Sequence, residues 1–173
     1  MTRWREPRAA SSPYITAEGY RVLQADLREL WQRRGAVTRA LAAAAAEGDR
    51  SENAEYLYRK RELRDLDARI AYLQRRLPTL QIVHTVGNQA QVFFGARVVL
   101  EQDDGSQHCY RIVGADELGE DTQNISVDSP LAKALLGKSS GDEVRIETAA
   151  RRQSYYIVAI QYGPREDQAP GEG

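Results

Sequence analysis

Two heptad patterns separated by a short polar segment are the feature that most constrains the fold of this chain. In each pattern apolar residues recur at alternating spacings of three and four, which places them along one stripe of an α-helix. The first stripe is Tyr20, Leu23, Leu27, Leu30, Arg34, Val37, Leu41 and Ala44, and the second is Tyr56, Arg59, Leu63, Leu66, Ile70, Leu73, Leu77 and Leu80. Because only a short turn separates them, the sequence predicts an antiparallel coiled-coil hairpin.

Signals for the ends of the two helices agree with this hairpin. Thr16 followed by Glu18 is typical of a helix start, and Pro78 is expected to end or distort the second helix. Each arm has roughly 30 residues, so the hairpin is expected to reach about 45 Å. The basic residues Arg34 and Arg59 interrupt the apolar stripes, and Arg59 indicates a break in the coiled-coil packing.

Beyond residue 91 the pattern changes to β-branched and aromatic residues, which favour strands. Strands are expected over residues 92–100, 109–113, 125–127, 144–148 and 154–161. Ser129 before Pro130 is typical of a helix start, and Gly137 follows the expected end of that short helix. The fold class is therefore α+β, with an N-terminal helical hairpin and a small antiparallel β-sheet domain that carries one short helix.

Composition excludes several classes of protein. The 173 residues contain no apolar run long enough to span a membrane, and residues 1–12 lack the apolar core of a secretory signal. The single Cys109 cannot form an internal disulfide, and its place in an expected strand favours a half-buried thiol over a nucleophile. His84 and His108 are isolated, without the spacing of a metal site. These features predict a cytoplasmic protein.

The net charge of −1 conceals an asymmetry between the two halves of the chain. Residues 1–80 hold 16 basic and 11 acidic residues, whereas residues 81–173 hold 8 basic and 14 acidic residues. The basic half is the one that could contact nucleic acid. The alternative is a solvated coiled coil whose surface carries charges of both signs.

Two carboxylates, Asp49 and Glu52, lie in the polar segment that joins the helices. They have a structural interpretation: Gly48 can end the first helix, Asp49 can cap the second, and Glu52 completes a capping box. A capping carboxylate still has lone pairs for a cation, and oxygen ligands without histidine or cysteine suit Mg²⁺. Two exposed carboxylates alone would hold Mg²⁺ poorly, so a metal site here requires ligands from a partner.

Residues 48–56, read with the basic run 59–61, resemble the Gre transcript-cleavage factors of bacterial RNA polymerase. A second matching motif covers residues 126–138 and continues into Gly-Asp-Glu-Val at 141–144. The resemblance extends over about residues 14–162. The residues between the acidic pair and the basic run after it resemble GreB-type members more than GreA-type members.

The resemblance implies that the hairpin enters the secondary channel of a backtracked polymerase and stimulates the polymerase's own cleavage of the nascent RNA 3′ end. Asp49 would help hold a second Mg²⁺, and Glu52 would orient or deprotonate the attacking water. Gly48, Ser51 and Asn53 would support the tip. The Mg²⁺ would be shared with the polymerase and not held stably by the free protein, and the chain itself would not be an enzyme.

The resemblance also implies an FKBP-like C-terminal domain that docks at the rim of the channel. Asp128, Ser129 and Pro130 match the docking loop, although helix initiation is a sufficient explanation for Ser129 and Pro130. In the family a basic patch on the second helix contacts the extruded RNA, and the residues of this chain that match it are Arg59, Lys60, Arg61 and Arg64. A solvated helix face is the alternative for these four residues.

These interpretations divide the chain into five segments. They are a disordered extension (1–13), the hairpin with its acidic tip (14–83), a linker (84–91), the FKBP-like domain (92–162) and a disordered tail (163–173). We expect a protein that is monomeric when active and contacts no membrane. The alternatives are a channel-occupying inhibitor, a coiled-coil adaptor of the polymerase, and a prolyl isomerase that acts through the FKBP-like domain.

Overall fold

The computed structural model describes residues 11–46, 54–84, 88–119, 121–148 and 151–163. The chain divides into two compact units, which are described separately. The first contains residues 18–80 and is helical. The second combines residues 81–163 with the segment 11–17, so the start of the described chain belongs to the β-rich unit.

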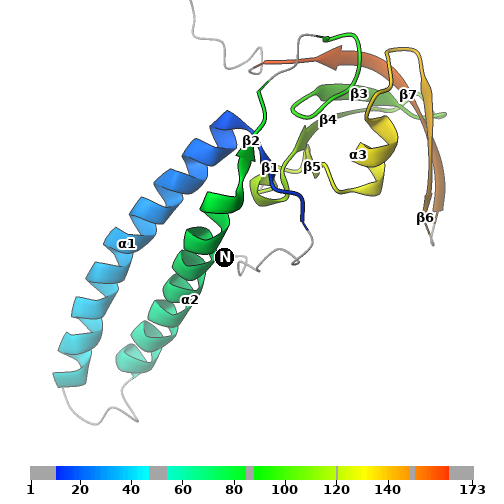
Figure 1. Ribbon diagram of the computed structural model, residues 1–173. Helices are drawn as coiled ribbons and strands as arrows, with labels where there is room; N and C mark the ends of the chain where they lie inside the picture. Colours follow the sequence, from blue (N-terminus) through cyan, green and yellow to red (C-terminus); the bar gives the residue numbers. More distant parts are fainter. Residues whose placement is uncertain (1–10, 47–53, 85–87, 120, 149–150, 164–173) are drawn as a thin grey trace, which may run out of the picture. The chain divides into compact units, whose positions relative to one another are not determined.

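The helical unit is the expected hairpin, made of α1 (Ala17–Ala46) and α2 (Ala54–Arg76) (Figure 1). A 3₁₀ turn, η1 (Leu77–Thr79), follows α2 at Pro78, which confirms that this proline ends the second helix. Residues 47–53, called the tip segment below, connect the two helices and lie outside the described residues. No helix in the described ranges is long and apolar enough to cross a membrane.

Burial confirms both heptad stripes as the seam between the helices. Every stripe position is buried or half-buried, while most positions between them are exposed. Leu66, Ile70 and Leu73 are among the most deeply buried residues on α2. Burying such a side chain contributes roughly 1.5–3 kcal/mol, so these residues supply most of the force that holds the hairpin together.

Ion pairs across the seam fix the antiparallel register of the two helices. Arg34 Nε lies 2.5 Å from Asp67 Oδ1, and Arg69 Nη2 lies 2.8 Å from Asp26 Oδ2. Residues early in α1 therefore face residues late in α2. The Arg34 pair is about half exposed, and such pairs contribute at most about 1 kcal/mol. They select the register, whereas the apolar seam supplies the stability.

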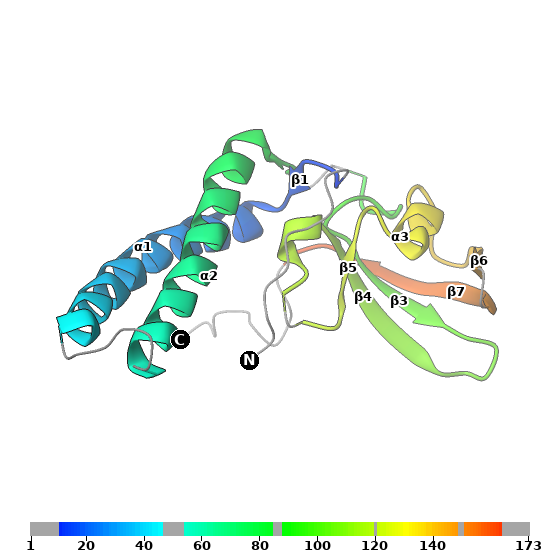
Figure 2. The same ribbon diagram turned by 90° about the horizontal axis from the view of Figure 1, so that it is seen from below.

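A curled five-stranded sheet forms the second unit, in the order β5-β4-β3-β7-β6 (Figures 1 and 2). The strands are β3 (Arg97–Glu101), β4 (Gln107–Val113), β5 (Asn124–Ser126), β6 (Glu143–Thr148) and β7 (Arg151–Gln161). The short helix α3 (Pro130–Leu135) packs against one face of this sheet. The core of the unit consists mainly of Val98, Leu100, Ile112, Val144, Tyr155 and Ile157 from the strands, with Ala132 and Leu135 from α3.

The predicted strand over residues 92–100 is wrong in its first half, because β3 begins only at Arg97. Val92 is fully buried, but its amide donates to Lys138 O at 2.8 Å and its carbonyl accepts from Gly137 N at 2.7 Å. Gly95 then takes a positive φ of 85° and breaks the extended path. The apolar character of this stretch reflects a buried loop that faces the end of α3.

One strand departs from the expected antiparallel arrangement. The edge strand β5 runs parallel to β4, with Ile112 opposite Ile125. The ten-residue connection includes the 3₁₀ turn η2 (Ala115–Glu117), and β5 then begins opposite Arg111, so that it pairs with the last three residues of β4. The other pairings, β3 with β4, β3 with β7 and β6 with β7, are antiparallel.

A short segment before α1 is anchored in the β-rich unit, and we call residues 12–16 the N-terminal strap. Within it β1 (Tyr14–Ile15) pairs in parallel with β2 (Gln81–Ile82), a pairing that the sequence did not predict. Ile15 is fully buried. The strap passes so close to Gly114 that a Cβ there would lie 2.1 Å from the carbonyl oxygen of Tyr14.

We predict that Gly114→Ala lowers the free energy of unfolding by about 2 kcal/mol, because the added methyl group must displace the strap. The matched substitution Gly35→Ala, inside α1, should raise stability by roughly 0.5–1 kcal/mol, since the nearest atom lies at 3.8 Å and alanine favours the helix. Thermal unfolding followed by circular dichroism checks both. An unchanged midpoint for Gly114→Ala would contradict the close approach of Tyr14.

Candidate functional site

The residues predicted for function fall into three groups, and the first lies outside the described residues. Gly48, Asp49, Ser51, Glu52 and Asn53 all belong to the tip segment, between the end of α1 and the start of α2. Their expected roles in capping or in metal binding therefore stay predictions. In the rest of the chain that the structure describes, no three His, Cys, Asp or Glu side chains gather as a metal site would require.

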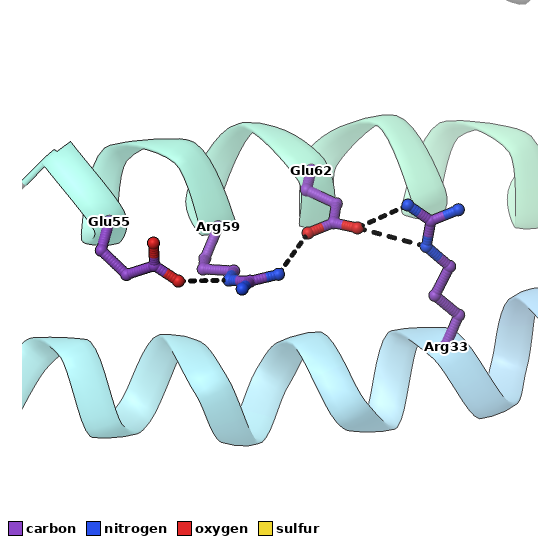
Figure 3. Close-up of polar contacts among 4 residues, drawn as sticks. All are labelled: Arg33, Glu55, Arg59 and Glu62. Carbon is purple, nitrogen blue, oxygen red and sulfur yellow. Dashed lines mark hydrogen bonds and ion pairs between the residues drawn. The ribbon is translucent and has the colours of Figure 1, made fainter. Parts of the chain in front are cut away.

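Arg59, the first residue of the predicted RNA-binding group, belongs to a network of charged side chains (Figure 3). Its guanidinium lies 2.7 Å from Glu55 on the same helix and 3.1 Å from Glu62, one turn further along. Glu62 in turn accepts from Arg33 of α1 at 2.6 Å. The four side chains thus alternate in charge and join the two helices.

The network shifts the pKa of two of its members away from their ordinary values. Hydrogen bonds to Glu55, and then to Glu62, raise the pKa of Arg59 above its ordinary value. The hydrogen bond from Arg33 is the main cause that lowers the pKa of Glu62, whose side chain is only 13% exposed. Glu55 and Glu62 both belong to α2, so Arg59 is engaged within its own helix, and the contact of Glu62 with Arg33 is the one in this network that joins the two helices.

Lys60, Arg61 and Arg64 differ from Arg59, because all three are exposed. Arg64 lies four positions after Lys60 and three after Arg61, which places all three on one side of α2, directed away from the seam. Two exposed apolar side chains adjoin the same stretch: Leu57, at 51% exposure, and Tyr58, at 58%. The Lys60 ammonium lies 5.9 Å from the ring centre of Tyr56. This exposed basic face has the chemistry to attract phosphate groups.

The predicted docking residues Asp128, Ser129 and Pro130 form the turn between β5 and α3. Ser129 caps α3, since its hydroxyl accepts from Ala132 N at 3.1 Å, and Pro130 occupies the first turn of the helix. Helix initiation is thus confirmed as one role of this pair. Pro130 is exposed and Asp128 is half-buried, so the turn presents part of its surface to solvent.

The N-terminal strap reaches this turn, a contact that sequence reasoning missed. Ser12 N donates to Asp128 Oδ2 at 2.8 Å, and the Ser12 hydroxyl donates to Asp128 Oδ1. The two residues are 116 positions apart in the chain. No local pattern around Ser12 signals such a contact, because serine followed by proline is also typical of an unstructured segment.

Comparison with known proteins identifies the family. Residues 13–82 match the family model "Transcription elongation factor, N-terminal", and residues 87–162 match "Transcription elongation factor, GreA/GreB, C-term". The transcription elongation factor GreB of Pseudomonas aeruginosa is 49% identical over 166 residues, which cover 95% of this chain and 99% of the relative.

Further relatives agree with the same family. GreB of Xanthomonas axonopodis pv. citri is 51% identical over 166 residues, which cover 94% of this chain and 98% of the relative. The solved structure of Thermus aquaticus Gfh1 is 27% identical, covers 89% of this chain and 100% of that chain, and has a TM-score of 0.42. Because the two GreB relatives match over nearly the whole chain, the resemblance to GreB-type members is confirmed. The chain belongs to the GreA/GreB family of transcription elongation factors.

Proposed function

We propose that this chain rescues backtracked bacterial RNA polymerase in the cytoplasm. In this proposal the hairpin enters the secondary channel of the polymerase, and the tip segment stimulates cleavage of the nascent RNA 3′ end. The polymerase supplies the active site and its Mg²⁺, while the chain supplies carboxylates. The chain is therefore an accessory factor of the polymerase and has no nuclease activity alone.

The observation that carries the proposal is the position of the acidic pair. Asp49 and Glu52 lie in the seven-residue segment that joins two antiparallel helices, and cross-helix ion pairs support that pairing. With 30 residues, α1 alone is about 45 Å long. A pair of carboxylates at the end of such a rod can reach a site that the rest of the protein cannot enter.

In the proposed mechanism the two carboxylates have different roles. The Asp49 carboxylate would help hold a second Mg²⁺, which when bound would supply Lewis-acid activation of water and stabilisation of developing negative charge. Glu52 accepts a hydrogen bond from that water and removes its proton. Gly48, Ser51 and Asn53 keep the segment in the shape that these roles require.

Two described surfaces support the proposal from outside the tip segment. The exposed basic face of Lys60, Arg61 and Arg64 suits contact with RNA phosphates, because positive side chains attract phosphate groups whatever the base sequence. The exposed part of the turn at 128–130 suits docking at the rim of the channel. Arg59 is left out of this face, because two carboxylates of its own helix engage it.

We predict that Asp49→Asn combined with Glu52→Gln reduces stimulated RNA cleavage by about 100-fold or more, in line with the loss of a positioned acid–base group. The measurement is the rate of cleavage in purified backtracked elongation complexes with Mg²⁺. Both changes preserve side-chain size, and binding to polymerase should stay intact. Glu47→Gln, which neutralises a third carboxylate in the tip segment, is the matched control and should retain full activity.

The alternative functions give different results in this assay. A channel-occupying inhibitor or an adaptor would bind without stimulating cleavage even as the wild-type protein. If the two carboxylates only cap α2, the double variant would lose about 1 kcal/mol of stability and still support cleavage. Either result would refute the shared-metal mechanism.

We further predict that Lys60→Gln, Arg61→Gln and Arg64→Gln together weaken binding to backtracked complexes and reduce its dependence on salt. Each phosphate contact to a single strand contributes roughly 0.7 to the slope of log affinity against log salt, so three lost contacts should reduce the slope by about 2. Binding titrations over a range of salt concentrations provide this slope.

Arg59→Gln is the matched control for the basic face. It also removes one positive charge from α2, but it breaks the contacts with Glu55 and Glu62. We expect it to lower the thermal stability of the hairpin and to leave the salt slope nearly unchanged. A salt slope that falls for Arg59→Gln and not for the triple variant would reverse the two assignments.

A further inference from the structure

The carboxylate of Asp128 is held by a residue from the other end of the chain. Ser12 donates two hydrogen bonds to it, one from the main-chain amide to Oδ2 at 2.8 Å and one from the hydroxyl to Oδ1. Because each donor binds a different carboxylate oxygen, the pair fixes both the position and the plane of the group. Bonds to a charged acceptor are stronger than bonds between neutral groups.

The main chain of the turn is fixed by its own local hydrogen bonds. Asp128 N donates to the Ser126 hydroxyl at 3.1 Å, and Ser129 N donates to Ser126 O at 2.9 Å. Ser129 then caps α3 through its hydroxyl. Since these bonds set the backbone, the contribution of Ser12 is to orient the Asp128 side chain.

The N-terminal strap is itself anchored well enough to serve as a fixed support. Thr16 N donates to Glu117 Oε2 at 3.0 Å, and the Thr16 hydroxyl donates to Oε1 of the same carboxylate. Gln81 N donates to Pro13 O at 2.8 Å. Ile15 is fully buried between these two anchors. Ser12 therefore approaches Asp128 from a segment with little freedom to move.

We propose that Ser12 is a positioning residue for polymerase docking, which it promotes by holding the Asp128 carboxylate in the orientation that the partner binds. This inference rests on the proposed docking role of Asp128. A carboxylate held before binding loses less rotational freedom on docking than a free one, so the contact increases affinity.

The test is an equilibrium titration of a purified bacterial RNA polymerase with the full-length protein and its variants. Ser12→Ala removes the hydroxyl bond and leaves the amide bond, so we expect the dissociation constant to rise roughly fivefold, the equivalent of one net hydrogen bond. Ser12→Thr restores a hydroxyl and should restore the affinity. Cleavage at saturating factor should not change, because Ser12 acts on docking.

Ser106→Ala is the matched control. The Ser106 hydroxyl also donates to an aspartate, Asp104 Oδ1 at 2.6 Å, but in the turn at the opposite end of β4 from β5. This variant should bind polymerase as the wild type does. Asp128→Asn should weaken binding by itself, and adding Ser12→Ala to it should cause no further loss, since Ser12 acts through that carboxylate.

The possible outcomes separate this inference from the docking assignment. Weaker binding for Asp128→Asn with unchanged binding for Ser12→Ala would overturn the positioning role and leave docking intact. Tighter binding for Ser12→Ala would also overturn it, because Ser12 would then compete with the partner. Unchanged binding for Asp128→Asn would refute the docking role and, with it, the inference. Equal losses for Ser12→Ala and Ser106→Ala would indicate a general loss of stability instead.

Discussion

The pairing of α1 with α2 is the interaction on which the proposed function depends, because delivery of the tip segment into the polymerase requires the two helices to stay together. Buried leucine and isoleucine side chains supply most of its stability, and ion pairs such as Arg34 with Asp67 select its register. A shift of one helical turn would separate these charges and move Asp49 and Glu52 relative to the helix axis. The seam thus links helix packing to the placement of the acidic pair.

The sequence predicted the features that depend on local patterns. The heptad stripes, the end of α2 at Pro78 and the cap of α3 at Ser129 were all confirmed, because periodicity and capping involve neighbours in the chain. The predictions from sequence were wrong where contacts between distant residues determine the structure. Val92 is buried in a loop that bonds to residues 137–138, and β5 pairs in parallel with β4. Neither partner can be recognised from the residues beside it.

The same division applies to the candidate site. Sequence grouped Arg59 with Lys60, Arg61 and Arg64, since all four are basic residues of one helix. The structure separates them, because Glu55 and Glu62 engage Arg59 while the other three are exposed. Likewise Asp128 was recognised, but Ser12, which orients it, was not. The Ser12 contact has no local signature, whereas the pairs of Arg59 with Glu55 and Glu62 are four and three residues apart, a spacing that the sequence itself shows.

In the proposed function the tip segment reaches the catalytic metal of the polymerase. Cutting of this chain by hydroxyl radicals that form at that metal tests this most directly. The catalytic Mg²⁺ of a backtracked complex is replaced by Fe²⁺, which generates hydroxyl radicals that cut nearby polypeptide. We predict that the bound chain is cut within or next to residues 47–53 and remains intact in the β-rich unit. Cuts confined to the β-rich unit, or no cuts in a chain that remains bound, would contradict the account.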